Sequence, residues 1–138
     1  MAIRIVRLGS PRQPDEGLRL GTVRRPPRGV PKAEFARRDF YDVWLPALSP
    51  SAVLVAEALQ VAAAGDDRGW ARFVKRFRAE MKQPDASQLL DLLAALSQRS
   101  DFSVGCYCAD EARCHRSVLR SLLEERGAAV TPGHAATV

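Results

Sequence analysis

The 138-residue chain has no uninterrupted apolar run that approaches the length needed to span a bilayer. Its first seven residues alternate charged and apolar side chains instead of building the apolar core of a signal peptide. Internal repeats and low-complexity tracts are also missing. These absences argue against a membrane protein and against a secreted one, so we expect a soluble, cytoplasmic protein without a membrane partner.

Cysteine and histidine are scarce, with three cysteines and two histidines in the whole chain. All three cysteines lie between residues 106 and 114, which is unlike the dispersed pairs of a secreted disulfide framework. In a reducing compartment, such a cluster indicates a metal site, thiol chemistry or the burial of small apolar side chains.

The totals suit one basic globular domain. The length is typical of a single domain, and an apolar share of 46% supplies enough material for one core. The formal net charge of +5 is compatible with an anionic partner, such as a phosphorylated molecule or a nucleic acid. Solvated arginines on helix surfaces would give the same charge, so charge alone does not identify a partner.

Hydrophobic periodicity predicts an α/β fold. Strands are expected at residues 3–8, 18–23 and 102–107, and helices at 49–64, around Trp70–Phe77, at 85–96 and at 116–125. The first two strands lack a helix-length crossover, so they are either antiparallel neighbours or not paired. The predicted fold is a single α/β domain over residues 1–127, with a short parallel or mixed sheet covered by four to five helices and a flexible tail at 128–138. Parallel strands would place helices on both faces of the sheet.

Two of these helices carry more specific signals. Ser49 followed by Pro50 favours a helix that begins at this point, with Ser49 as its N-cap. The helix at 85–96 carries leucines on more than one face, so we expect it to be deeply buried.

A basic turn follows the second predicted strand. Residues 24–32 contain three prolines and a glycine, which exclude regular structure, together with three arginines and a lysine. Because ligands of α/β proteins gather beyond the carboxyl ends of strands, Arg25 and Arg28 are candidate anion-binding residues. The alternative is a solvated basic connection.

The segment GCYCADEARCHR, residues 105–116, follows the third predicted strand and opens the last helix. The first turn of a helix directs unpaired N–H groups and a positive dipole end into the preceding loop, which favours anions and lowers a thiol pKa. Cys108, where the strand opens into the loop, is the candidate nucleophile. Arg116 could bind a phosphate or carboxylate with two parallel hydrogen bonds, and His115 is a candidate general acid or base.

The same segment shares one spacing with rhodanese loops, because four residues separate Cys108 from Arg113. Asp110 and Glu111 lie inside this loop, however. Two carboxylates there would repel an anion and raise the thiol pKa, so we treat the spacing as accidental.

Zinc is an alternative occupant of the segment. Cys106, Cys108, Cys114 and His115 could together supply four sulfur and nitrogen ligands. Against this interpretation, Cys114 and His115 are adjacent, and the two-residue gap of zinc knuckles is missing. Burial as a small apolar residue explains Cys106 equally well. We therefore predict no cofactor, with zinc as the alternative.

Taken together, these motifs resemble the family called domain of unknown function 488 (DUF488). Its members typically carry an apolar strand, a cysteine, a short acidic loop and then Cys-His-Arg at the start of a helix, which is the order of GCYCADEARCHRSVLRSLLEERG. The upstream segments RRPPRGVPKAEF, FYDVWLPALSPSAVLV and WARFVKRFRAEM follow the order of further family blocks, so the resemblance spans residues 3–127.

The resemblance implies a small bacterial α/β domain but no defined reaction. By transfer, its site candidates are Cys108, Glu111, Cys114, His115 and Arg116, together with Arg28 of the basic turn. Many members have Trp-Pro-Arg-Gly where this chain has Pro26-Pro27-Arg28-Gly29, so no role of that tryptophan transfers.

The sequence supports three functional hypotheses. The preferred one is a protein that binds, or also acts on, a phosphorylated or otherwise anionic small molecule held by Arg28, His115 and Arg116 beside Cys108. The second is a nucleic-acid-binding or regulatory protein, which the charge favours although no helix-turn-helix, zinc-finger or RNA-binding signature is present. The third is a domain stabilised by a metal on its cysteines and His115. The sequence leaves open whether the protein is an enzyme and what its oligomeric state is.

Overall fold

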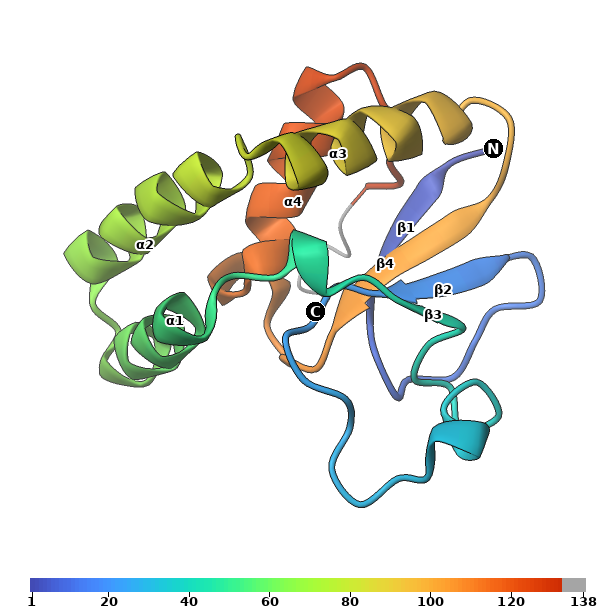
Figure 1. Cartoon of the computed structure of the whole chain (residues 1–138), viewed down its shortest axis with the longest axis horizontal. Helices are drawn as coiled ribbons and strands as arrows, with labels where there is room; N and C mark the ends of the chain where they lie inside the picture. The colour runs from blue at the N-terminus through green and yellow to red at the C-terminus, as the bar shows by residue number, and fades with distance from the viewer. Residues whose placement is uncertain (133–138) are drawn as a thin grey trace.

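The computed structural model describes residues 1–132 and forms a parallel sheet with helices packed against it (Figure 1). The strands are β1 (Ile3–Arg7), β2 (Leu18–Gly21), β3 (Val43–Trp44) and β4 (Phe102–Cys106), and their order across the sheet is β1-β4-β2-β3. All three strand pairs are parallel. The predicted single α/β domain is therefore confirmed, and of the two expected sheet types the parallel one is correct.

The last strand of the chain, β4, lies between the first two. Phe102 pairs with Ile3 on one side and with Leu18 on the other. β1 and β2 are thus not paired with each other, which is the second of the two expected arrangements. Because β1, β2 and β4 run in one direction, their carboxyl ends meet at one edge of the sheet, where α/β proteins bind ligands.

Four α-helices connect or follow the strands: α1 (Ala52–Ala64), α2 (Asp67–Glu80), α3 (Pro84–Leu96) and α4 (His115–Glu125). They gather on one face of the sheet (Figure 1). There, Ile3, Ile5, Leu20, Phe102 and Val104 share one core with buried side chains from all four helices. The expectation of helices on both faces is wrong, because β1 is joined to β2 by a loop without an α-helix.

The second face of the sheet is covered by loops and holds a buried ion pair. Arg19 Nε donates to Glu16 Oε1 at 2.6 Å, and both side chains are almost fully buried. Ser103 Oγ donates to the same carboxylate at 2.8 Å, and the Arg19 guanidinium also donates to the carbonyl oxygens of Ser10 and Asp39. Burial alone would raise the pKa of Glu16, but the donors around its carboxylate outweigh burial and lower the pKa. The network fastens two loops to the sheet.

Two local expectations are corrected, for the start of α1 and the burial of α3, and the sheet contains one unexpected strand. α1 begins at Ala52 with Ser51 as its N-cap, because Ser49 ends a preceding 3₁₀ turn. β3 is not predicted, because two residues are too few to show an alternation of apolar and polar side chains. α3 is buried on one face only, since Leu92 and Leu96 are exposed.

The end of the described chain lies beside β1. Ile3 N–H donates to the Ala129 carbonyl oxygen at 2.8 Å, and Thr131 N–H donates to the Ile3 carbonyl oxygen at 2.9 Å. Residues 133–138 of the predicted flexible tail lie outside the described residues. Within residues 1–132, no helix combines the length and the apolar character that crossing a membrane requires.

We predict that Glu16→Ala destabilises the fold strongly, because it leaves the buried Arg19 guanidinium without its anion. The expected loss is about 3–5 kcal/mol of unfolding free energy, measured by urea denaturation. Glu57→Ala, which breaks the exposed pair with Arg76, is the matched control and should cost at most about 1 kcal/mol. Equal losses in the two variants would contradict this account.

The same ion pair has a pH signature. Because folding lowers the pKa of Glu16, its stabilising contribution should be complete above its unfolded-state pKa and should be lost as the pH falls through the folded-state value. The wild type should therefore lose more stability on acidification than a Glu16→Gln variant.

Candidate functional site

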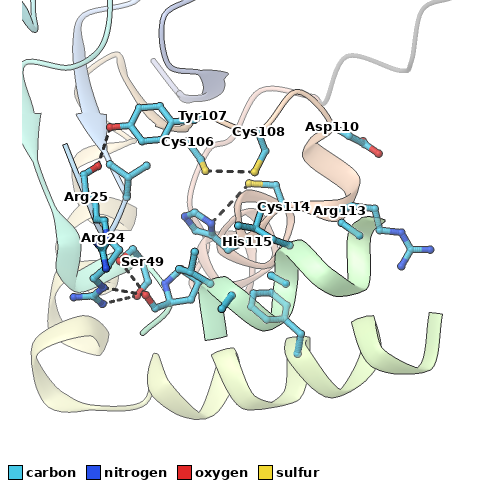
Figure 2. A pocket seen from close by; sticks show the side chains of 18 of the residues that line it. Arg24, Arg25, Ser49, Cys106, Tyr107, Cys108, Asp110, Arg113, Cys114 and His115 are labelled. Carbon is cyan, nitrogen blue, oxygen red and sulfur yellow. Dashed lines mark hydrogen bonds between the residues drawn. The ribbon is translucent and has the colours of Figure 1, made fainter. Parts of the chain in front are cut away.

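A pocket of about 730 Å³ lies beyond the carboxyl ends of β2 and β4 (Figure 2). One part of its lining comes from the residues that follow these two strands and from the start of α4, and the rest comes mainly from α1. The position is the one at which parallel α/β sheets bind ligands. The volume falls within the range of about 300–1,000 Å³ that is usual for small-molecule sites.

All three cysteines and His115 line this pocket. Cys106 ends β4, and Cys108 follows two positions later, so that their Sγ atoms lie 3.8 Å apart. Cys114 is the N-cap of α4, and His115 is the first residue of that helix. The Sγ atoms of Cys106 and Cys114 and a ring nitrogen of His115 lie within 4.8 Å of one another and could hold a metal ion. The fold thus gathers these four residues at the loop between β4 and α4.

The hydrogen bonds of His115 define its tautomer. Its Nε2 atom lies 2.6 Å from the carbonyl oxygen of Thr22, and because a carbonyl oxygen only accepts, Nε2 must carry the proton. Nδ1 faces the Sγ atom of Cys114 at 3.7 Å, so it is the nitrogen that can take a proton from this thiol. A thiol, a base and a group that orients the base are the parts of an activated nucleophile.

The three thiols lie close enough to one another and to His115 for the pKa values of the thiols to be shifted. The neighbouring thiols of Cys106 and Cys108, with support from His115, lower the pKa of Cys114 against the effect of burial. The neighbouring thiols and burial raise the pKa of Cys106. A hydrogen bond from Cys106 lowers the pKa of Cys108, but the Cys114 sulfur and burial outweigh it and raise the pKa. Of the three thiols, Cys114 is therefore the one whose ionisation its surroundings favour most.

Arg116 places a buried positive charge behind the cluster. It is 3% exposed and does not line the pocket, and its Nη2 donates to the Cys108 carbonyl oxygen at 2.6 Å. Its Nε has no hydrogen-bond partner, and no carboxylate within residues 1–132 forms an ion pair with it. Arg116 is therefore a buried cation beside the cysteine loop whose charge no carboxylate of the described chain offsets.

Arg24 and Arg25 bring positive charge to another side of the pocket (Figure 2). Arg24 is half-buried and donates to two backbone carbonyl oxygens just before α1. Arg25 is exposed, and its own carbonyl oxygen accepts from the Tyr107 hydroxyl. Neither arginine forms an ion pair with a carboxylate in the described part of the chain. Arg28 is exposed and lies outside the pocket lining, so the structure does not bring it together with the cysteines.

The charged side chains of the loop after Cys108 are engaged elsewhere. Asp110 accepts a backbone N–H of the short 3₁₀ turn that it caps, and Figure 2 shows it directed away from the sulfur atoms. Glu111 pairs with Arg120 of α4 at 2.8 Å and so ties the loop to that helix. Arg113 pairs with Asp67 of α2 and also points away from the cysteines (Figure 2). The repulsion expected from the two carboxylates is therefore reduced.

Sequence reasoning missed two contributors to the site. Thr22 directly follows β2 and orients His115 through its carbonyl oxygen, a backbone role that carries no side-chain signal. Arg24 belongs to the same basic run as Arg25 and Arg28, and nothing in the sequence separates the two that line the pocket from the one that does not.

Comparison with known proteins supports the resemblance that the motifs indicate. The family model DUF488-N3a, described as "Active DUF488-N3 subclade", matches residues 3–127. The matched range includes the basic turn and the whole cysteine segment. No curated protein and no solved structure matches the chain.

We predict that the reduced, metal-free protein holds a thiolate at pH values well below the ordinary thiol range, because the pKa of Cys114 is lowered. Ultraviolet absorbance of the thiolate during an acid titration measures this without requiring access to the sulfur. His115→Gln should raise the transition by about one pH unit or more, because it removes the imidazole nitrogen that faces the Cys114 sulfur. A low-pH transition that persists unchanged in Cys114→Ser would contradict the assignment.

Proposed function

Because the chain belongs to the DUF488 family, and the matching family model is described as active, we propose that this protein is a thiol-dependent enzyme for an anionic small molecule. The observation that carries the proposal is the cluster of three cysteines around His115 in a pocket that also has Arg24 and Arg25 in its lining. Thiols, an oriented base and positive charge are the components that nucleophilic attack on an anionic ligand requires.

We assign the attack on the ligand to Cys108. It is half-buried whereas Cys106 and Cys114 are buried, so its sulfur is the most open of the three to a bound ligand. The Cys114 thiolate serves as the first acceptor of the Cys108 proton, which transfers the negative charge to the accessible sulfur. Arg116 favours this transfer, because its positive charge offsets a small part of the rise in the Cys108 pKa and its guanidinium holds the Cys108 carbonyl oxygen.

The chemical step then balances within the site. The Cys108 Sγ atom forms a bond to the electrophilic atom of the ligand, and the bond from that atom to the leaving group breaks with its electron pair. The leaving group takes the proton that His115 Nδ1 had received from the cluster, and the former Cys108 proton stays on Cys114. The bond from His115 Nε2 to Thr22 keeps the ring oriented throughout.

Arg25 and Arg24 are the residues we assign to the anionic group of the ligand. Arg25 is exposed at the pocket, so its guanidinium can turn toward a phosphate or a carboxylate and bind it with two parallel hydrogen bonds. Arg24 is anchored by backbone carbonyl oxygens and contributes a fixed charge. Arg28 and Arg116 take no direct part in this proposal, since neither lines the pocket.

A second proposal is that the same cluster holds zinc. A tetrahedral zinc ion at about 2.3 Å from each sulfur separates two sulfurs by about 3.8 Å, and the Cys106 and Cys108 sulfurs are 3.8 Å apart. The Nε2–H of His115 donates to a backbone carbonyl, which is how metal-binding histidines are commonly oriented. Zinc would occupy the sulfur electron pairs that the first proposal uses, so the two states exclude each other.

We predict that iodoacetate, an anionic reagent, alkylates Cys108 faster relative to neutral iodoacetamide in the wild type than in Arg25→Gln. Removing one charge near the reacting atom should lower the ratio of the two rates by about fivefold at low salt. Peptide mass spectrometry of the chelator-treated protein locates the modified cysteine and measures both rates.

Arg28→Gln is the matched control, because Arg28 belongs to the same basic turn but lies outside the pocket lining. Its rate ratio should equal that of the wild type. An equal drop in both variants would assign anion attraction to the whole turn, and modification at Cys114 instead of Cys108 would overturn the assignment of the attacking sulfur.

For the metal proposal, we predict that one cobalt(II) ion binds per chain and gives the sulfur-to-cobalt charge-transfer bands of thiolate coordination. Cys106→Ser should weaken binding by about tenfold or more, since it removes a ligand. Cys108→Ser decides whether the fourth ligand is this sulfur or a molecule in the pocket. An absence of stoichiometric cobalt or zinc binding by the reduced protein would eliminate this proposal.

A further inference from the structure

Helix α1 has an unusual relation between composition and burial. Its sequence AVLVAEALQVAAA has only two polar residues, Glu57 and Gln60. A helix that is apolar on nearly all sides is normally buried, but here Leu54 is the only buried residue. Val53 and Leu59 are more than 60% exposed. α1 therefore carries apolar side chains that do not pack into the core of the fold.

Some of these side chains face the pocket. The α1 residues in the lining are Ala52, Val55, Ala56, Ala58, Leu59 and Ala62. Five of them, at positions 52, 55, 56, 59 and 62, follow the spacing that places side chains on one side of a helix. We call these five the α1 stripe. Three of the five are alanines, which leave room between the helix and the cysteines, and Leu59 projects among them.

The reactive and charged residues of the pocket lining come from other elements. The cysteines and His115 stand at the loop between β4 and α4, and Arg24 and Arg25 stand after β2. A ligand that fills the pocket thus meets thiols and positive charge at the segments that follow β4 and β2, and a stripe without any hydrogen-bonding side chain on α1. An inorganic anion would use only the polar residues and would leave the α1 stripe exposed to water.

We propose that the α1 stripe is the binding site for the apolar part of the ligand, and that the substrate is an organic anion with an acyl chain or an aromatic ring. This inference rests on the proposed function, because it assigns the anionic group to Arg25 and Arg24. The charge complementarity of these arginines, which lack a carboxylate partner among the described residues, favours an anionic ligand over a second copy of the chain. The volume of about 730 Å³ exceeds what a small inorganic anion needs.

The test uses the carboxylates acetate, butanoate, hexanoate and octanoate as probes, with binding measured by calorimetry. If the chain lies along the stripe, the dissociation constant should fall by about fourfold for each methylene added until the stripe is covered. Ala56→Trp fills the space at the stripe and should remove this dependence on length. Leu59→Ser should reduce the gain for each methylene without blocking the pocket.

Ala63→Trp is the matched control, since Ala63 is also exposed on α1 but is absent from the pocket lining. It should bind all four carboxylates as the wild type does. Equal affinity across the series, or equal losses in both tryptophan variants, would overturn the proposal. A dimer in sedimentation equilibrium that Ala56→Trp dissociates, without any dependence on chain length, would instead identify the stripe as an interface between copies and would also overturn it.

Calorimetry does not depend on a reactive thiol, so it separates this inference from the proposed function. Alkylation of Cys108 by iodoacetamide is measured in parallel. Failure of alkylation together with length-dependent binding would reject the enzyme and retain the apolar site. Normal alkylation together with length-independent binding would retain the thiol chemistry and reject the apolar site.

Discussion

The hydrogen bond from His115 Nε2 to the carbonyl oxygen of Thr22 is the contact on which the arrangement of the site depends. Thr22 is itself fixed to β4, because both its N–H and its Oγ1 donate to the Gly105 carbonyl oxygen. The start of α4 is thereby joined to the ends of the two strands that flank the pocket. One backbone carbonyl sets the position of the helix, the tautomer of the imidazole and the direction in which Nδ1 faces Cys114.

The one-sided packing of the sheet explains why the pocket is open. All four α-helices use one face, and the other face is held by loops through the buried pair of Arg19 and Glu16. The connection from β1 to β2 contains no α-helix, whereas the connection from β3 to β4 contains α1, α2 and α3 in succession. Figure 1 shows α1 and α2 extending away from the sheet, so that α1 covers the carboxyl edge from a distance instead of packing onto it. The space between that helix and the strand ends is where the cysteines lie.

The sequence predicts the helices and strands whose hydrophobic periodicity is clear. It does not predict which residues form ion pairs or hydrogen bonds with each charged side chain. The strands at both ends of the chain and the final helix show clear periodicity, and the order strand, loop, helix was sufficient to place Cys108 and His115 together. Whether Arg116 points into the pocket or behind it depends on how α4 is rotated against β4, which its neighbours in sequence do not reveal. Arg19 is buried against Glu16, whose carboxylate also accepts a hydrogen bond from Ser103, far away in the chain. For α1, composition predicts burial, and only the fold shows that its apolar surface faces a pocket.

Charge balance connects the buried arginine to the choice of an anionic ligand. Arg116 is buried, and neither it nor the pocket arginines Arg24 and Arg25 form an ion pair with a carboxylate in the described chain. In the proposed step, the cluster would lose its negative charge while His115 gives its proton to the leaving group, so the net charge of these groups would stay the same and the arginine cations around the pocket would remain. A ligand that carries its own negative charge would offset this positive charge from the pocket side, whereas a neutral ligand would not. Under the proposed mechanism, the positive charge that favours a thiolate before reaction would therefore also favour an anionic molecule over a neutral one in the covalent state.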